Sequence, residues 1–122
     1  SIHNMGGHKV QGKKQSDAEK LANEAAALET AGCFSLVLEC IPTNLGRQVS
    51  ESLTIPTIGI GAGPFTNGQV LVLQDLLGAN PTFTPKFLRR YANTYETILS
   101  GVNHFHRDVV SHCYPSAKES YK

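Results

Sequence analysis

A single carboxylate at the end of an apolar run is the residue in this sequence whose type and position best suit catalysis. Glu39 lies within residues 34–42, a mostly apolar run that follows Gly32 and is closed by Pro42. A short run with these boundaries predicts a strand buried on both faces of a parallel sheet. Because α/β enzymes place catalytic groups at the carboxyl ends of such strands, Glu39 is a candidate catalytic residue. The alternative is an acid just past the strand that caps or pairs at the surface.

Side-chain alternation predicts the direction in which this acid points. It divides the strand into one face with Ser35, Val37 and Glu39 and another with Leu36, Leu38 and Cys40. We expect the wholly apolar face to pack on helices. The face that carries Glu39 is then expected to look into a barrel or crevice.

A second candidate feature is the glycine-rich end of residues 55–63. Alternation is expected to turn Ile58 and Ile60 toward the helices and Gly59 and Gly61 inward, where missing side chains leave room for a ligand or a neighbouring backbone. We therefore predict that Gly59 and Gly61 line a substrate pocket. A bend or bulge explains the same glycines, and a phosphate cradle is a weaker option because Pro64, not a lysine, follows.

Helices are predicted on both sides of the first strand. Ser16 and Glu19 have the spacing of a capping box, and Gly32 is expected to end the helix in a left-handed conformation. The apolar stripe of this helix contains Ala18, Leu21, Ala22, Ala25 and Leu28. Residues 43–53 predict a second helix, capped by Thr43 or Asn44, whose core residues are Leu45, Val49, Ser52 and Leu53. Helix and strand alternate as in βαβ units, which predicts an α/β fold with a parallel sheet.

The remaining segments are less regular. Residues 1–15 predict a loop in which His8 and Lys9 either contact a ligand or lie on a tied-down surface. Residues 69–75 form a third apolar run that follows the second one closely. Either a nearly extended loop connects the two runs, or the third run is not a standard parallel strand. After a loop at residues 79–85, a long helix is expected from residue 85 or 86 toward residue 110.

The composition excludes several classes of protein. A net charge of +1 and only 17% charged residues give no basic surface for nucleic acid, and no apolar stretch approaches the ~20 residues of a membrane span. The first four residues resemble neither a signal peptide nor a transit peptide. Three cysteines, an odd number, indicate reduced thiols in a cytoplasmic protein. The late cluster of His104, His106, His112 and Cys113 matches no compact zinc pattern.

Several segments, in order and with near-family spacing, resemble the ketopantoate (3-methyl-2-oxobutanoate) hydroxymethyltransferase family. They are GGHKVQG (6–12), AALE (26–29) with AG (31–32), LVLECIP (36–42), LTIPTIGIGAG (53–63), GQVLVL (68–73) and PKF (85–87). They cover most of residues 5–92, and the segment after Asn93 matches poorly. Gln74 stands where the family commonly has histidine, and Asn67 where it commonly has aspartate.

The resemblance implies a (β/α)8 barrel enzyme of pantothenate biosynthesis, cytoplasmic and homo-oligomeric. It implies hydroxymethyl transfer from 5,10-methylenetetrahydrofolate to 3-methyl-2-oxobutanoate, giving 2-dehydropantoate, with Mg²⁺ as cofactor. The family's general base falls on Glu39. Such a base removes a proton beside a ketone, and a metal bound to the keto acid can stabilise the enolate.

A complete barrel of this kind needs about 250 residues and eight strands. We therefore expect a C-terminal part of the barrel, with strands that resemble the sixth to eighth and with the Mg²⁺ ligands in an absent N-terminal half. The expected organisation is a single segment with a loop at 1–15, βα units at 16–78 and a helical region at 79–122. Alone, this chain is expected to be inactive. The alternatives are a non-catalytic half-barrel remnant or assembly partner, and a keto-acid lyase on the same barrel.

Overall fold

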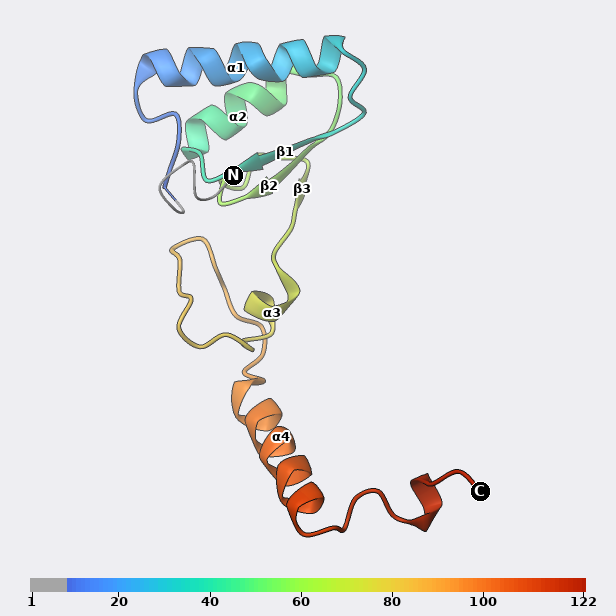
Figure 1. Ribbon diagram of the computed structural model, residues 1–122. Helices are drawn as coiled ribbons and strands as arrows, with labels where there is room; N and C mark the ends of the chain where they lie inside the picture. Colours follow the sequence, from blue (N-terminus) through green and yellow to red (C-terminus); the bar gives the residue numbers. More distant parts are fainter. Residues whose placement is uncertain (1–8) are drawn as a thin grey trace. The chain divides into compact units, whose positions relative to one another are not determined.

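The computed structural model describes residues 9–122, which fall into two compact units (Figure 1). The first unit ends at Leu71, and the second consists of Val72–Lys122. This boundary lies seven residues before residue 78, the predicted end of the βα units. The first unit contains α1 (Gln15–Thr30), β1 (Leu36–Glu39), α2 (Thr43–Ser52), β2 (Thr57–Ile60) and β3 (Gly68–Gln69). The second contains α3 (Leu73–Leu76), α4 (Tyr95–Val110) and the 3-10 turn η2 (Ala117–Glu119).

The three strands form one parallel sheet in the order β1-β2-β3. In β1 and β2 the register pairs Leu36 with Thr57 and Glu39 with Ile60. The predicted α/β class and parallel sheet are therefore confirmed. Three parallel strands are consistent with part of a barrel, and their assignment to the sixth to eighth strands stays a prediction.

Both long helices of the first unit lie on one side of this sheet (Figure 1). Leu36 and Leu38 of β1 are buried, whereas Val37 between them is 60% exposed. The apolar face of β1 thus packs under the helices, as predicted. The buried core of this unit is formed by Ala25, Leu36, Leu38, Ile41, Leu45, Val49, Leu53 and Ala62.

Helix α1 ends as predicted but does not begin as predicted. Gly32 is left-handed, with φ +100°, at the end of the helix. The capping box is wrong: the N-cap is Lys14, which makes no side-chain cap bond, and Ser16 lies inside the first turn. The Lys14 carbonyl already accepts the Ala18 N–H at 3.0 Å, so helical bonding starts before Ser16 can cap it.

Helix α2 follows Pro42 without a side-chain cap from Thr43 or Asn44. The predicted core residues Leu45, Val49 and Leu53 are buried. Ser52 is exposed instead, and its hydroxyl donates to the Val49 carbonyl at 2.9 Å.

Gly46 lies inside α2, where glycine is unfavourable, because the helix packs closely against another part of the chain at this position. A Cβ at Gly46 would collide with the carbonyl oxygen of Ala62, so the glycine lets the helix approach the chain that leaves β2.

The predicted orientation of β2 is wrong. Because residues paired in a parallel register share a face, Thr57 lies on the helix side with Leu36, whereas Ile58 and Ile60 lie on the opposite side. Thr57 is fully buried because its hydroxyl is satisfied by the Ser50 hydroxyl of α2, at 2.7 Å. A paired threonine can therefore take the buried position that the sequence pattern assigned to isoleucine.

The connection from β2 to β3 contains no crossover helix, but it is a loop of bends and turns and not the nearly extended loop that the sequence allowed, because β3 is short and begins beside Ile58. Asn67 holds its end, since the side-chain oxygen accepts the Thr57 N–H at 2.8 Å and the Thr57 hydroxyl at 3.1 Å. The rest of the third apolar run is not a strand. Its residues Val72 and Leu73 are mostly exposed and lead into α3.

The second unit begins its long helix later than predicted. Residues 85–94 are irregular because the Tyr91 and Thr94 N–H groups donate to the Leu76 and Leu77 carbonyls, at 2.8 and 3.1 Å, and not to a helix. Helix α4 does continue past Gly101, as predicted. No helix among residues 9–122 has the length and apolar character needed to span a membrane.

One carboxylate joins α1 to the start of β2. Glu29 Oε1 accepts the Thr54 N–H at 2.6 Å, the Thr54 hydroxyl at 2.7 Å and the Ile55 N–H at 3.0 Å. The hydrogen bond from the Thr54 side chain, followed by the two backbone donors, lowers the pKa of Glu29 below its ordinary value. The charged form is therefore favoured in the folded chain.

The pH dependence of unfolding tests this contact. A depressed folded-state pKa gives stabilisation that is complete above the unfolded pKa of about 4.3 and is lost as the pH falls through the folded value. We expect urea unfolding to show that Glu29→Gln is less stable than the unaltered chain at pH 7, and the difference to shrink below pH ~4. Glu51→Gln, on the exposed side of α2, should show no such trend. A difference for Glu29→Gln that is the same at pH 7 and pH 3 would contradict this interpretation.

Candidate active site

Glu39 is the last residue of β1 and projects from the sheet face opposite the helices. Its side chain is exposed, and it shares this face with Val37 and, across the register, with Ile58 and Ile60. The predicted face is therefore confirmed. The expected enclosure is not observed, because no described element of the first unit covers this side of the sheet.

The residue after Glu39 has an unusual backbone conformation. Cys40 is left-handed at φ +50°, although it is not glycine, and its side chain is buried. Burial, and secondarily the negative charge of Glu39, raises the pKa of the Cys40 thiol. This cysteine is therefore an inert thiol that packs into the fold, not a nucleophile.

Of the two glycines predicted to line a pocket, Gly59 faces the other way, and the pocket role of Gly61 stays a prediction. Gly59 pairs with Leu38 and so lies on the helix side, and a Cβ there would come within 2.7 Å of the Thr66 hydroxyl. The inward direction predicted for Gly59 is therefore wrong. Gly61 has φ +67°, as a turn requires, and its carbonyl accepts the Ile41 N–H at 3.1 Å.

The glycine turn after β2 packs closely against Thr43, the first residue of α2. A Cβ at Gly63 would lie 2.7 Å from the Thr43 hydroxyl, and the Gly63 carbonyl accepts the Gln69 side-chain amide at 2.9 Å.

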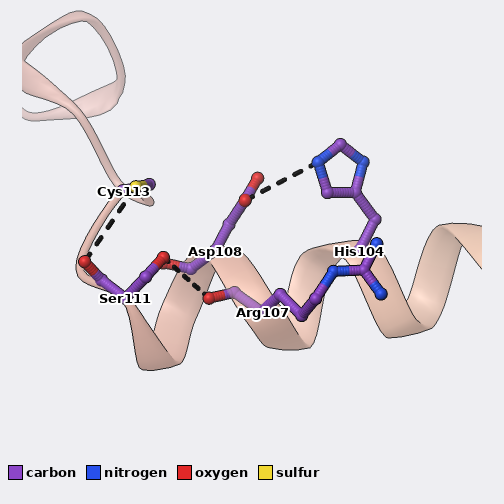
Figure 2. Close-up of polar contacts among 5 residues, drawn as sticks. All are labelled: His104, Arg107, Asp108, Ser111 and Cys113. Atoms are coloured by element: carbon purple, nitrogen blue, oxygen red, sulfur yellow. Dashed lines mark hydrogen bonds and ion pairs between the residues drawn. The ribbon is translucent and has the colours of Figure 1, made fainter.

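Figure 2 shows that His104 and Cys113 of the second unit make separate polar contacts. His104 Nε2 lies 3.6 Å from Asp108 Oδ1 on the exposed surface of α4, and Cys113 Sγ lies 3.9 Å from the Ser111 carbonyl. Within residues 9–122 there is no group of three His, Cys, Asp or Glu side chains that could hold a metal ion.

Sequence reasoning missed two neighbours of Glu39. Ile60 lies directly beside it through the register, and Gln11, from the segment before α1, donates its N–H to the Cys40 carbonyl at 2.7 Å. Part of the predicted loop at residues 1–15 is thus tied down, whereas His8 lies outside the described residues. Exposed Lys9 makes only one described contact, since its carbonyl accepts the Gln11 side-chain amide at 3.1 Å. Strand register would have revealed Ile60, but no sequence signal indicates the bond from Gln11.

Comparison with known proteins decides the family. Residues 1–117 match the family described as ketopantoate hydroxymethyltransferase. The chain belongs to the ketopantoate hydroxymethyltransferase family. The match runs beyond residue 93, so the C-terminal segment that carried no recognisable motif also belongs to the family region.

Curated relatives of this hydroxymethyltransferase family are named 3-methyl-2-oxobutanoate hydroxymethyltransferase. The protein from Coxiella burnetii is 52% identical over 115 residues, which are 94% of this chain and 43% of the relative. The protein from Heliobacterium modesticaldum is 50% identical over 117 residues, 96% of this chain and 42% of the relative. The protein from Bdellovibrio bacteriovorus is 47% identical over 121 residues, 99% of this chain and 46% of the relative. The chain therefore spans less than half the length of these relatives.

Thiol labelling tests the packing around the candidate base. With a chromogenic disulfide at pH 8, exposed Cys113 should react first and Cys40 at least ~10-fold more slowly, because a buried thiol with a raised pKa contains little thiolate. Glu39→Gln should modestly speed the labelling of Cys40, since it removes a neighbouring negative charge. Mass spectrometry of the labelled peptides identifies each site, and equal rates for Cys40 and Cys113 in the folded chain would contradict the structure.

Proposed function

We propose that this chain supplies the general base of a 3-methyl-2-oxobutanoate hydroxymethyltransferase. The reaction transfers a hydroxymethyl group from 5,10-methylenetetrahydrofolate to 3-methyl-2-oxobutanoate and gives 2-dehydropantoate. The observation that carries this proposal is the position of Glu39, at the carboxyl end of a parallel strand and on the face that the helices leave free. Family membership supplies the reaction class.

The proposed role of Glu39 is proton abstraction. A carboxylate oxygen takes the proton from C3 of the keto acid, and the bonding electrons form an enolate whose C3 then attacks the one-carbon unit. The one-carbon unit exchanges its two bonds to folate nitrogens for the new bond to C3 and a bond to a hydroxyl oxygen from water, and tetrahydrofolate leaves. Val37, Ile58 and Ile60 make the surroundings of the carboxylate apolar. An apolar, closed site would exclude water and make a carboxylate a stronger base.

The open face supports a division of the active site between this chain and further sequence. Val37 is 60% exposed and Glu39 is exposed, so the described residues of the first unit do not by themselves enclose a substrate. We infer that the chain forms the sixth to eighth strands of a (β/α)8 barrel, on the basis of its ordered motifs, and that the other strands close the pocket.

We propose that the cofactor site lies outside the described residues of this chain. Residues 9–122 offer no group of three acidic, histidine or cysteine side chains for a metal ion, so the Mg²⁺ ligands and the folate site would lie in the remaining strands. No step assigned to Glu39 here depends on them. A cytoplasmic location and a homo-oligomer stay predictions from the family resemblance.

Two other functions give different results in the same experiments. A non-catalytic half-barrel that only assembles with another chain would leave a completed barrel inactive. A keto-acid lyase on the same barrel would cleave a carbon–carbon bond of its substrate and would transfer no one-carbon unit from folate.

A hybrid enzyme tests the proposed division. We expect the purified 122-residue chain to be inactive, because no element among the described residues of its first unit covers the face of Glu39. A hybrid in which this chain replaces the matching 115 residues of the Coxiella burnetii relative should form 2-dehydropantoate. Product is measured with Mg²⁺, the keto acid and the folate. Turnover by the chain alone, or a folded hybrid without activity, would contradict the proposal.

Isotope exchange tests the base itself. In the hybrid with Mg²⁺, deuterium exchange at C3 of 3-methyl-2-oxobutanoate should fall by roughly 10²- to 10⁴-fold in Glu39→Gln, the range of general base catalysis. Glu51→Gln removes an exposed carboxylate from α2 and should leave exchange unchanged. Undiminished exchange in a folded Glu39→Gln hybrid would remove Glu39 from proton transfer.

A further inference from the structure

Three backbone hydrogen bonds converge just behind the candidate base. Cys40 N–H donates to the Ile60 carbonyl at 2.9 Å, and Ile41 N–H donates to the Gly61 carbonyl at 3.1 Å. On the other side, the Cys40 carbonyl accepts the Gln11 N–H at 2.7 Å. We call Gln11, Cys40 and Ile41 the Glu39 clamp. It fixes the end of β1 between the end of β2 and the segment that precedes α1.

The central residue of the Glu39 clamp is held in a strained conformation. Its φ of +50° lies in the left-handed region, which residues with a Cβ rarely adopt. Such conformations persist only where the surrounding structure determines them. Here both backbone groups of Cys40 are bonded, and its side chain and that of Ile41 are buried.

Glu39 depends on this backbone for its direction. Among residues 9–122 its carboxylate has no hydrogen-bond partner that would orient it. The β1–β2 register holds Glu39 beside Ile60, and the Glu39 clamp holds the next residue. The direction in which the Cα–Cβ bond of Glu39 leaves the sheet is therefore set by the peptide units on its two sides.

We propose that Cys40 is a positioning residue for Glu39, because its left-handed, doubly bonded backbone and buried side chain fix where the base points. This inference rests on the proposed function of Glu39. It assigns Cys40 no contact with substrate. The proposed role of Cys40 requires a buried Cβ that restricts the backbone at this position. It does not require a reactive thiol.

The test compares glycine and alanine at this position in the hybrid enzyme. Cys40→Gly relieves the strain but frees the backbone, so kcat for C3 deuterium exchange, per folded enzyme, should fall about 10-fold or more with KM within about 2-fold. Cys40→Ala keeps the Cβ and should recover most of the lost kcat. Cys33→Gly is the matched control, a half-buried cysteine before the same strand, and should leave kcat within about 2-fold.

A second variant tests the clamp without changing Cys40. Gln11→Pro removes the N–H that bonds the Cys40 carbonyl and should also lower kcat, whereas Lys13→Pro, at an exposed position of the same segment, should not. Unchanged kcat in both Cys40→Gly and Gln11→Pro would overturn the positioning role, as would equal losses in Cys40→Gly and Cys33→Gly. If Glu39→Gln retains full exchange, the proposed function itself fails. A fall in Glu39→Gln without a fall in the clamp variants refutes only this inference.

Discussion

The parallel register between β1 and β2 is the constraint on which the rest of the first unit depends. It places Leu36 and Leu38 with Thr57 and Gly59 beneath the helices, and Val37 and Glu39 with Ile58 and Ile60 on the other face. A shift of one residue in β1 would turn the Glu39 carboxylate into the core, and a shift of one residue in β2 would turn Ile58 and Ile60 there in place of Thr57. The burial of Leu36 and Leu38 and the bonds made by Thr57 both oppose that shift.

Polar contacts from outside the strands hold this register at both ends. Glu29 binds the backbone just before β2, Asn67 binds Thr57 at its first residue, and the Gln11 bond lies at the carboxyl end of β1. Asn67 stands where the resemblance suggests aspartate, and its side-chain oxygen supplies an acceptor that either residue has. The site is thus positioned by local contacts that a search for catalytic residue types would pass over.

Elements whose stability is local could be predicted from the sequence, and elements that depend on distant contacts could not. The apolar run around Val37 and the glycine stop at Gly32 were sufficient for β1 and for the end of α1. The face of β2 was predicted wrongly because hydrophobicity favours burying Ile58, whereas Ser50 and Asn67 satisfy Thr57 in the core. The long C-terminal helix was placed too early for a similar reason. Bonds to Leu76 and Leu77 hold residues 91 and 94 outside it.

We propose that Glu39 points into the substrate site of a closed barrel. The most direct measurement is a crystal structure of the hybrid enzyme with 3-methyl-2-oxobutanoate bound. We expect a Glu39 carboxylate oxygen roughly 3–3.5 Å from C3 of the keto acid, the separation of a near-attack arrangement. A carboxylate turned toward the helices or to bulk water, with the keto acid bound elsewhere, would contradict it.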